Sequence, residues 1–593
     1  MPHSNVVPHA GFQALILCGP GVSLNTFTSN PEEFPKALVP IANRPMVWYP
    51  LDWCYRMGIT NITLITPESS QPALEAALSQ NPHLTSLPSP SPSVLAPPDL
   101  TFTTGTSELL RLPEVQTCIK SDFMLLPCDL ICDLLGESLL EAWMSNHGAL
   151  DGSSVGEAFS NRVSSMVGVS GEKGGRRGGI GVWYPMPTKE EKVKGDVADF
   201  LAVAPLDEDD APAAKGGPGG NGSVRASLSK LVYAAPMDTL KNTMEENKAF
   251  LIRHSLVKRH GKVKLLTTYR DAHIYMFPYW VKEMAKRNER FESVSEDLIG
   301  WWAKAEWQDG LGEKLGLREV FAEQEKETNP SAFGTNSHDI ERVEQEIDLT
   351  AMSTTKSGTY SAVKSDGSSE PTTTSTPLLL PTRTNTFPQH PDDTEPAKNQ
   401  GKLTVPPILA YVHPSQPSAP LIRRVDSSAL LLSISLKLAK LDSITDLGSR
   451  DAASPFAHTN KIAYPAGVAA RCTITKADCL VADNVTVEEK CVIKESVIGA
   501  NCHIASGVRL TRCLLMDGAV VEERCQLTGC IIGRRSKIGR ESVLKDCEVQ
   551  DGNVVPEETE AAGEKFMVFE GLDEEMDEFD DGEMEGEGGE GGF

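Results

Sequence analysis

The chain has 593 residues, a formal net charge of -26, and hydrophobic and charged fractions of 40% and 23%. This length exceeds what one hydrophobic core organises, so we expect two or more domains joined by linkers. The acidic balance argues against direct nucleic-acid binding, and the chain lacks both a bilayer-length apolar run and the basic start of a signal peptide, so we expect a cytosolic protein without membrane contact.

The first predicted element is a buried strand at residues 11–17 that runs into a glycine loop with Gly19 and Gly21. A helix is expected between residues 46 and 57, and a second strand is expected at 61–66. These elements predict a β-loop-α-β unit.

A further apolar strand is predicted at residues 123–126 and leads to Asp129. Ligands in open α/β sheets bind beyond the carboxyl ends of the strands, so this acid lies where a site would form. The glycine loop after the first strand would offer backbone N–H groups to a phosphate at the same edge.

Composition divides the rest of the chain. Residues 85–98 are rich in Pro and Ser and residues 206–223 in acids and Gly, so both are predicted to be surface insertions in a first domain of residues 1–325. Residues 326–403 are dense in Ser, Thr, Pro and charge, which predicts a disordered linker. Residues 404–470 are then a connecting segment.

A strict repeat marks residues 471–556. Branched aliphatic residues recur there in steps of 6, 6 and 5: Val481, Val487, Ile493, Ile498, Ile504, Leu510, Leu515, Val521, Leu527, Ile532, Ile538, Leu544 and Val549. A period of 17 residues does not fit an α-helical stripe, but it fits a three-sided coil of stacked parallel strands. We therefore predict a left-handed parallel β-helix of hexapeptide repeats that serves packing and assembly.

The position two residues before each of these aliphatic residues is always small. It is occupied by Cys479, Val485, Cys491, Ser496, Cys502, Val508, Cys513, Ala519, Cys525, Cys530, Ser536, Ser542 and Cys547. A narrow prism needs small side chains where its walls bend inward, and a free thiol behaves as a small hydrophobic group. Cys513, Cys530 and Cys547 are thus expected to stack as a ladder, and no metal site is predicted because no Cys-x-x-Cys pair occurs.

Residues 557–593 form an acidic tail with 16 acids and one Lys, a net charge of -15. This composition predicts a solvated, disordered segment. The alternative is contact with a basic partner surface, for which Phe579 and Phe593 would be anchors.

Residues 34–46 read Phe-Pro-Lys-Ala-Leu-Val-Pro-Ile-Ala-Asn-Arg-Pro-Met and follow the glycine loop. This pairing resembles the sugar-nucleotide pyrophosphorylases, in which a G-x-G-x-R-L loop and a P-K-x-x-x-P segment surround a nucleoside triphosphate and a sugar phosphate. Many of those enzymes also carry a hexapeptide β-helix. The resemblance implies a Rossmann-like α/β nucleotidyltransferase fold and a nucleotide pocket formed by Gly19, Gly21, Lys36 and Asp129, with Asp129 as the counterpart of a magnesium-binding aspartate.

The chain departs from that family at the catalytic positions. Ser23 stands in the place of the catalytic arginine, and a hydroxyl cannot neutralise a leaving pyrophosphate as a guanidinium does. The Glu-Lys-Pro motif has no counterpart, and residues 271–275 read Asp-Ala-His-Ile-Tyr in place of Asn-x-Gly-x-Tyr. We predict a retained fold without catalytic residues, metal or cofactor, in which residual nucleotide binding is left open.

Such a fold resembles the gamma and epsilon subunits of eukaryotic translation initiation factor 2B, the guanine-nucleotide exchange factor for initiation factor 2. The runs Leu-Leu-Pro-Cys-Asp-Leu-Ile at 125–131, Asp-Ala-His-Ile-Tyr at 271–275 and Ser-Val-Ser-Glu-Asp-Leu-Ile at 293–299 resemble gamma subunits. Epsilon subunits add a helical exchange domain after the β-helix, and the residues after Pro556 are too few and too polar for such a domain.

The gamma-type resemblance implies a non-catalytic subunit that supports exchange by an epsilon-type partner. The implied partners are that subunit, the other subunits of the complex, and initiation factor 2 as the substrate GTPase. The alternatives are an active sugar-1-phosphate nucleotidyltransferase, such as a mannose-1-phosphate guanylyltransferase, or a regulatory subunit of one.

Three further residues have structural interpretations. His273 lies in an apolar strand and is expected to be a partly buried histidine with its hydrogen bonds satisfied, not a catalytic base. Trp301 and Trp302 are expected to pack a helix, with a partner contact by one of them as the alternative.

Overall fold

The chain is represented by a computed structural model. It describes residues 12–19, 23–143, 178–206, 227–328 and 403–567, with short gaps at 102, 137–138, 141–142, 188–192, 194, 251, 417 and 451–452. The predicted insertion at 206–223 lies outside the described residues except for Leu206, and the predicted linker except for its first three residues and its last. The acidic tail beyond Met567 also lies outside them.

The N-terminal apolar runs form the parallel half of a nine-stranded sheet. β1 (Gln13–Leu17) lies between β4 (Asn61–Ile65) and β6 (Phe123–Pro127) in parallel register. The helix predicted after Pro45 is α1 (Trp48–Arg56), which buries Leu51 and Trp53 against this half-sheet. The predicted β-loop-α-β unit and the strand before Asp129 are confirmed, with bounds shifted by one to three residues.

The stretch 85–98 is not purely a surface insertion. Its centre is β5 (Ser93–Leu95), which pairs in parallel with β4 and forms the edge of the sheet. Val94 and Leu95 pack against the cores on opposite faces of the sheet. The prediction was wrong here because a three-residue strand between prolines is too short for composition to reveal.

The second half of the sheet is mixed, and the full strand order is β5-β4-β1-β6-β11-β8-β12-β10-β9. The added strands are β8 (Gly179–Pro185), β9 (Asp199–Ala204), β10 (Leu228–Pro236), β11 (Lys264–Phe277) and β12 (Ile408–Val412). The long strand β11 pairs with β6, β8 and β9, so β11, β8, β12, β10 and β9 form a closed ring of strand pairs.

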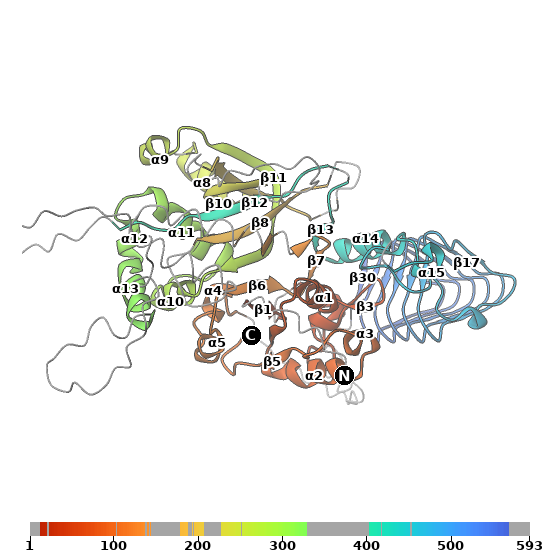
Figure 1. The fold of residues 1–593 in the computed structure, drawn as a ribbon. Helices are drawn as coiled ribbons and strands as arrows, with labels where there is room; N and C mark the ends of the chain where they lie inside the picture. Colours follow the sequence, from red (N-terminus) through yellow and green to blue (C-terminus); the bar gives the residue numbers. More distant parts are fainter. Residues whose placement is uncertain are drawn as a thin grey trace, which may run out of the picture. The chain divides into compact units, whose positions relative to one another are not determined.

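The prediction of a connecting segment at 404–470 is wrong for its first part. β12 lies between β8 and β10 in the middle of the sheet, and Ala410 pairs with Gly181 and Ser229 (Figure 1). The segment then forms β13 (Ile422–Arg424), which pairs with β7 (Leu130–Cys132), and the apolar helix α14 (Ser428–Ala439). A strand whose neighbours lie far away in the sequence gives no local signal of its place in a sheet.

Helices cover both faces of the sheet. They are α2 (Gln71–Gln80), α3 (Pro82–Thr85), α4 (Thr106–Leu109), α5 (Pro113–Cys118), α8 (Met237–Asn247), α9 (His254–Arg259), α10 (Trp280–Arg287), α11 (Ile299–Trp307), α12 (Leu311–Lys314) and α13 (Leu317–Thr328). The short helix α15 (Ile444–Leu447) belongs to the segment that leads into the β-helix. Alternate residues of β1 enter different cores, because successive side chains of a strand point to opposite faces: Ala14 and Ile16 pack with α1, and Leu15 packs with α10 and α11.

Trp302 is a residue of α11, and its side chain is fully buried in the core. Its indole N–H donates a hydrogen bond to the backbone oxygen of Pro406 at 2.8 Å, and its ring lies edge-on to Trp280. Trp301 is 40% exposed. The packing role predicted for this pair is therefore confirmed for Trp302, and a partner contact by Trp301 stays a prediction.

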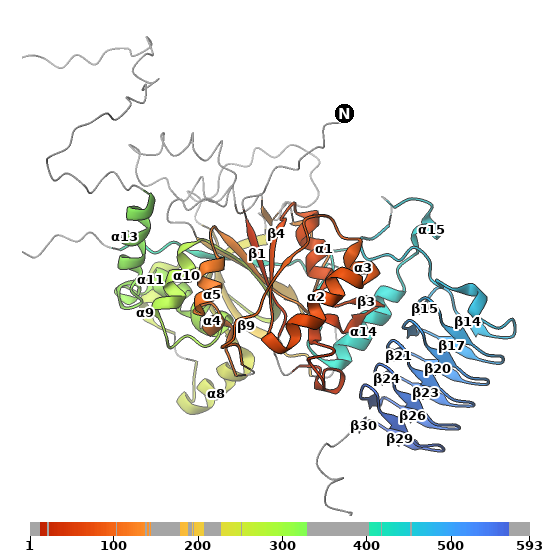
Figure 2. The ribbon, with the colours of Figure 1, turned by 90° about the horizontal axis from the view of Figure 1, so that it is seen from below.

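The C-terminal part is a left-handed β-helix with three parallel sheets (Figure 2). The first sheet contains β14 (Thr473–Ile474), β17 (Val492–Lys494), β20 (Arg509–Thr511), β23 (Gln526–Thr528), β26 (Val543–Lys545) and β29 (Glu560–Ala562). The second contains β15 (Leu480–Val481), β18 (Val497–Ile498), β21 (Leu514–Leu515), β24 (Ile531–Ile532), β27 (Glu548–Val549) and β30 (Lys565–Phe566). The third contains β16 (Thr486–Val487), β19 (His503–Ile504), β22 (Val520–Val521), β25 (Lys537–Ile538) and β28 (Val554–Val555).

The repeat in the sequence is the register of these sheets. Leu510 pairs with Leu527, and Leu527 pairs with Leu544, so each coil places an aliphatic side chain above the same residue of the previous coil. All thirteen predicted aliphatic residues and all thirteen small residues are buried. The cysteines among them are free thiols, as expected for a packing role, and Cys513, Cys530 and Cys547 occupy equivalent positions.

The β-helix extends beyond the predicted bounds at both ends. The steps of 6, 6 and 5 continue through Val555, Ala561 and Phe566, so the coil ends at β30 and not at residue 556. The prediction stopped early because Ala561 and Phe566 are not branched aliphatics. An extra bridge joins Ile462 to Val481, and this first coil is longer than the later ones.

The second sheet of the β-helix turns its outer face toward the α/β domain. Leu480, Val497 and Leu514 point outward there and share one core with Leu431 and Ile434 of α14. Contact with α14 therefore explains why these three outward positions of the β-helix are apolar.

Two negative observations apply to the part of the chain that the structure describes. None of its helices is long and apolar enough to span a membrane. No three His, Cys, Asp or Glu side chains in it gather as metal ligands would.

We expect the Ile532→Ala substitution to destabilise the β-helix by about 2–4 kcal/mol, because it leaves a cavity in a fully buried layer. The measurement is urea unfolding followed by circular dichroism. Gln526→Ala, at an exposed position of β23, is the matched control and should change stability by less than about 0.5 kcal/mol. Equal effects of the two substitutions would contradict the assigned register.

Candidate functional site

Lys36 and Asp129, two of the predicted pocket residues, meet at the carboxyl ends of the parallel strands. Asp129 follows β6 and is 1% exposed, and Lys36 begins the short 3-10 helix Lys36–Leu38. The Lys36 Nζ lies 2.7 Å from the Asp129 Oδ2. Two residues of the predicted site thus form a largely buried ion pair.

Arg424 at the end of β13 is a third member of this site that sequence reasoning missed. Its Nε lies 3.1 Å from the Asp129 Oδ1 and its Nη2 lies 3.2 Å from the Oδ2. Asp129 and Arg424 are 295 positions apart in the sequence, and residues 329–402, which the structure does not describe, lie between them. No local pattern marks Arg424, because its partner is set by the pairing of β13 with β7.

The Asp129 carboxylate has little capacity left for another ligand. A carboxylate offers about four lone-pair positions, and three N–H donors of Lys36 and Arg424 already occupy this one. Burial opposes its ionisation, but Arg424 and Lys36 outweigh burial and hold the pKa of Asp129 well below its ordinary value. A magnesium ion would have to displace these cations, so the residues present do not fit a metal site of the pyrophosphorylase type.

The ion pair continues as a chain of alternating charges across the strand ends. Arg424 approaches Asp426 at 3.8 Å, and Arg270 of β11 binds Asp426 and Asp196 at 2.6 Å each. The three cations Lys36, Arg424 and Arg270 thus face the three carboxylates of Asp129, Asp426 and Asp196. The network is neutral in sum, which suits a structural role and not the recognition of a highly charged phosphate.

The run at 271–275 forms a second hydrogen-bonded group beside this network. The Asp271 carboxylate accepts bonds from the Tyr275 hydroxyl at 2.5 Å and from the His273 backbone N–H at 2.8 Å. Burial and the nearby Asp199 raise the pKa of Asp271 to about 7. Burial, with help from the positive charge of Arg424, lowers the pKa of His273 well below its ordinary value, so this half-buried histidine is neutral.

The glycine loop is described only in part. Gly19 has a φ of 140°, a backbone conformation that residues with a side chain rarely adopt. Ser23 lies half-buried in the turn that follows, and Gly21 lies outside the described residues. Nucleotide binding by these residues stays a prediction.

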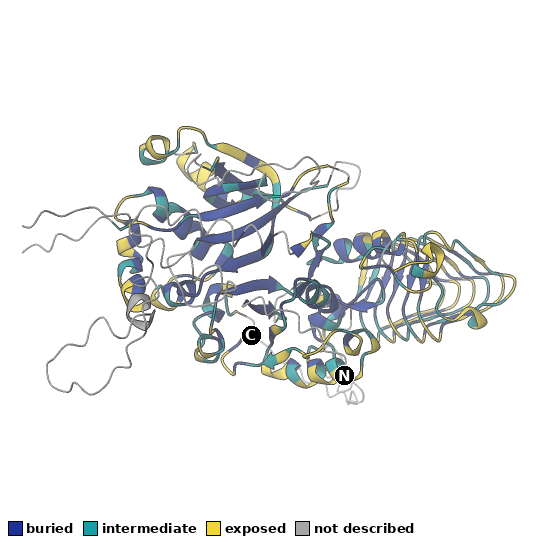
Figure 3. Ribbon diagram, viewed as in Figure 1, coloured by how far each residue is buried: buried dark blue, intermediate teal, exposed yellow. Residues whose placement is uncertain are grey.

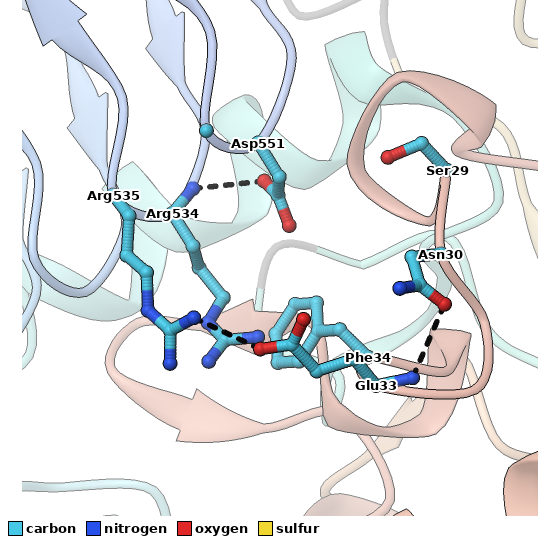
Figure 4. A pocket seen from close by; sticks show the side chains of 8 residues that line it. Ser29, Asn30, Glu33, Phe34, Arg534, Arg535 and Asp551 are labelled. Carbon is cyan, nitrogen blue, oxygen red and sulfur yellow. Dashed lines mark hydrogen bonds and ion pairs between the residues drawn. The ribbon is translucent and has the colours of Figure 1, made fainter.

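The segment 34–46, which resembles the P-K-x-x-x-P segment of pyrophosphorylases, contacts the β-helix together with the adjacent Glu33 (Figure 4). The Arg534 guanidinium lies 3.9 Å from the centre of the Phe34 ring, and Arg535 forms an ion pair with Glu33 at 2.9 Å. Asn43 donates a hydrogen bond to the backbone oxygen of Ile498 at 2.9 Å. The contacts of Arg534 and Arg535, but not that of Asn43, border a small cavity of about 140 Å³.

Buried Arg44 fixes the end of the same segment. Its guanidinium donates hydrogen bonds of 2.8 Å to the backbone oxygens of Phe456 and Ala457 and lies over the Trp48 ring. Residues 34–46 are therefore held by the chain on both sides, which makes them a packing surface more than a ligand loop.

Comparison with known proteins agrees with this architecture. Residues 463–561 match a family described as the EIF2B subunit epsilon LbH domain. A 300-residue stretch, 50% of this chain, is 29% identical to translation initiation factor eIF2B subunit gamma from Schizosaccharomyces pombe and covers 52% of that protein. The chain is thus similar to eIF2B subunits in both comparisons. It spans about half the length of the known eIF2B gamma subunit that it matches, so the activity and partners of that whole protein enter below only as proposals.

The chain should lose about 3–5 kcal/mol of stability on Arg424→Met, because the substitution leaves the buried Asp129 carboxylate with one cation. Urea unfolding at neutral pH measures the effect. Arg423→Met is the matched control, since the Arg423 guanidinium donates its hydrogen bonds to the backbone oxygens of Pro185 and Ile422. If Arg424→Met lowered the free energy of unfolding less than Arg423→Met does, the stabilising role of the ion pairs around Asp129 would be contradicted.

The dependence of stability on acid pH should show that folding depresses the pKa of Asp129. A carboxyl whose pKa is depressed by folding stabilises the fold above its ordinary pKa of about 4, and this contribution is lost as the pH falls. We expect the stability gap between the wild type and Asp129→Asn to be constant from pH 7 to about 5 and to narrow between about 5 and 3. A gap that widens on acidification would show that the pKa is not depressed.

Proposed function

We propose that this chain is a non-catalytic, gamma-type subunit of the exchange factor that acts on initiation factor 2. The observation that carries the proposal is the Asp129 carboxylate, whose positions are taken by Lys36 and Arg424. An aspartate committed to two internal cations is unsuited to holding magnesium for nucleotidyl transfer. The similarity to eIF2B subunits supports the direction of the assignment.

In this proposal the two folded parts have separate roles. The α/β domain supplies a surface that helps to hold the substrate GTPase, and the β-helix, with its regular flat faces, supplies contacts for assembly. GDP release on initiation factor 2 is accelerated by an epsilon-type subunit, with which this chain and the other subunits assemble. The complex acts in the cytosol.

An active sugar-1-phosphate nucleotidyltransferase is less well supported. Such an enzyme needs a cation at the leaving pyrophosphate, where this chain has Ser23, and a free acid for magnesium. A regulatory subunit of such an enzyme is compatible with the same pocket, and co-purification distinguishes it from the leading proposal.

The purified chain alone should not accelerate GDP release from initiation factor 2, and adding it to an epsilon-type subunit should raise the exchange rate of that subunit several-fold. The measurement is the release of a fluorescent GDP analogue. Tagged chain from a eukaryotic lysate should elute with exchange-factor subunits. Robust exchange by the chain alone would contradict the proposed division of roles.

A second assay uses magnesium, a nucleoside diphosphate sugar and labelled pyrophosphate. Neither the wild type nor Ser23→Arg is expected to form nucleoside triphosphate, because restoring the arginine does not free Asp129. Turnover by the wild type would establish the transferase alternative instead.

A further inference from the structure

One surface of the α/β domain has a charge opposite to that of the whole chain. Residues 248–270 contain no Asp or Glu, although the chain carries a net charge of -26. Six cations in this stretch are exposed: Lys248, Arg253, Lys258, Arg259, Lys262 and Lys264. Within the described part of the chain, Arg259 is the one of these six that forms an ion pair, with Glu306 at 3.4 Å. We call residues 248–265 the basic surface.

Large apolar side chains lie between these cations. Ile252, Val257 and Leu265 are 55%, 59% and 50% exposed. They come from α9, its preceding loop and the start of β11, and α9 has no buried residue (Figure 3). Three exposed aliphatic residues of this size in one short segment are typical of a surface that binds another polypeptide.

The C-terminal segment of the chain has the complementary composition. Residues 568–593 contain twelve acids and no Lys or Arg. The acids alternate with large apolar residues: Val568, Phe569, Leu572, Met576, Phe579, Met584 and Phe593. Both the charge and the apolar content of the basic surface are therefore matched by one segment of the same chain.

We propose that residues 568–593 bind the basic surface of their own chain. Ion pairs between the acids and cations such as Arg253 and Lys258 would supply long-range attraction, and Phe569 and Phe579 would cover the exposed aliphatic residues. The 26 residues after Met567 reach up to about 85 Å when extended, so the segment is long enough to cross a domain. The proposal does not depend on the function proposed above.

Two other occupants fit the surface less well. The acidic run Asp-Glu-Asp-Asp at 207–210 follows β9, where Val203 pairs with Lys264, but the large apolar residue next to it, Leu206, already packs against the core. A nucleic acid would match the charge, but the exposed apolar side chains of the basic surface are aliphatic and offer no ring for base stacking.

The consequence is a surface that is covered in the free chain. A basic partner that binds residues 568–593 would uncover the basic surface. An acidic partner that binds the basic surface would instead release residues 568–593. A tethered segment has an effective concentration on the order of millimolar at a surface of its own chain. A competing partner must therefore bind tightly enough to overcome that concentration.

The experiment uses the full chain and a chain that ends at Met567. A fluorescent peptide of residues 568–593 should bind the shortened chain, and its affinity for the full chain should be at least tenfold lower, because the tethered segment already occupies the surface. Binding should weaken by about tenfold or more between 50 and 200 mM salt, as ion pairs are screened. Fluorescence anisotropy measures both effects.

Variants locate the site. Arg253→Glu/Lys258→Glu/Lys262→Glu and, separately, Ile252→Ser/Val257→Ser/Leu265→Ser should each reduce peptide binding at least tenfold. All six positions are exposed, so both variants should fold. Lys494→Glu/Arg509→Glu/Lys545→Glu reverses three exposed charges on the β-helix and should leave binding unchanged. A peptide with Phe569→Ser and Phe579→Ser, which keeps its charge, should bind several-fold more weakly.

Five outcomes would overturn the proposal. They are an absence of peptide binding, equal loss with the β-helix control, and equal affinity of the peptide for the full and shortened chains. The fourth is protection of residues 252–265 from hydrogen exchange that depends on protein concentration, which would assign the segment to a second copy. Neutralising residues 207–210 should leave peptide binding unchanged, and a large gain would show that this run is the occupant instead.

Discussion

The buried carboxylate of Asp129 is the interaction on which the domain depends. Lys36 from the first βα region, Asp129 after β6 and Arg424 after the long undescribed segment meet at one point. Each of these charges would be costly to bury alone, and together with Arg270 and its acids they form a neutral network. The same contacts that hold three distant segments together occupy the acid that a transferase would use for its metal.

The β-helix and residues 34–46 show the same change of use. In the pyrophosphorylases that this chain resembles, such a segment and a glycine loop surround a nucleoside triphosphate and a sugar phosphate. Here Phe34 lies against Arg534, and Asn43 donates a hydrogen bond to the backbone of β18. Internal contacts thus occupy positions where the resemblance would place ligand contacts.

The sequence predicted most where signals are local or periodic. The strands around β1, helix α1 and the coil register followed from apolar runs and from the 17-residue period, and Lys36 and Asp129 were placed at one site by resemblance. The sequence did not reveal Arg424, β12 or β5. Arg424 and β12 find their partners across the undescribed segment, and β5 is only three residues long, so no window of the sequence contains the interactions that define them.

The position of β12 has a consequence for how the domain is made. Strand β12 lies between β8 and β10, yet more than half of the chain precedes it. During synthesis the ribosome must release residue 412 before the middle of the sheet can close, so β8 and β10 emerge long before the strand that joins them. β10 ends at residue 236 and β12 at residue 412, so nascent chains of this protein expose two unpaired strand edges while the 176 residues between these points are synthesised, a state in which chaperone binding would matter.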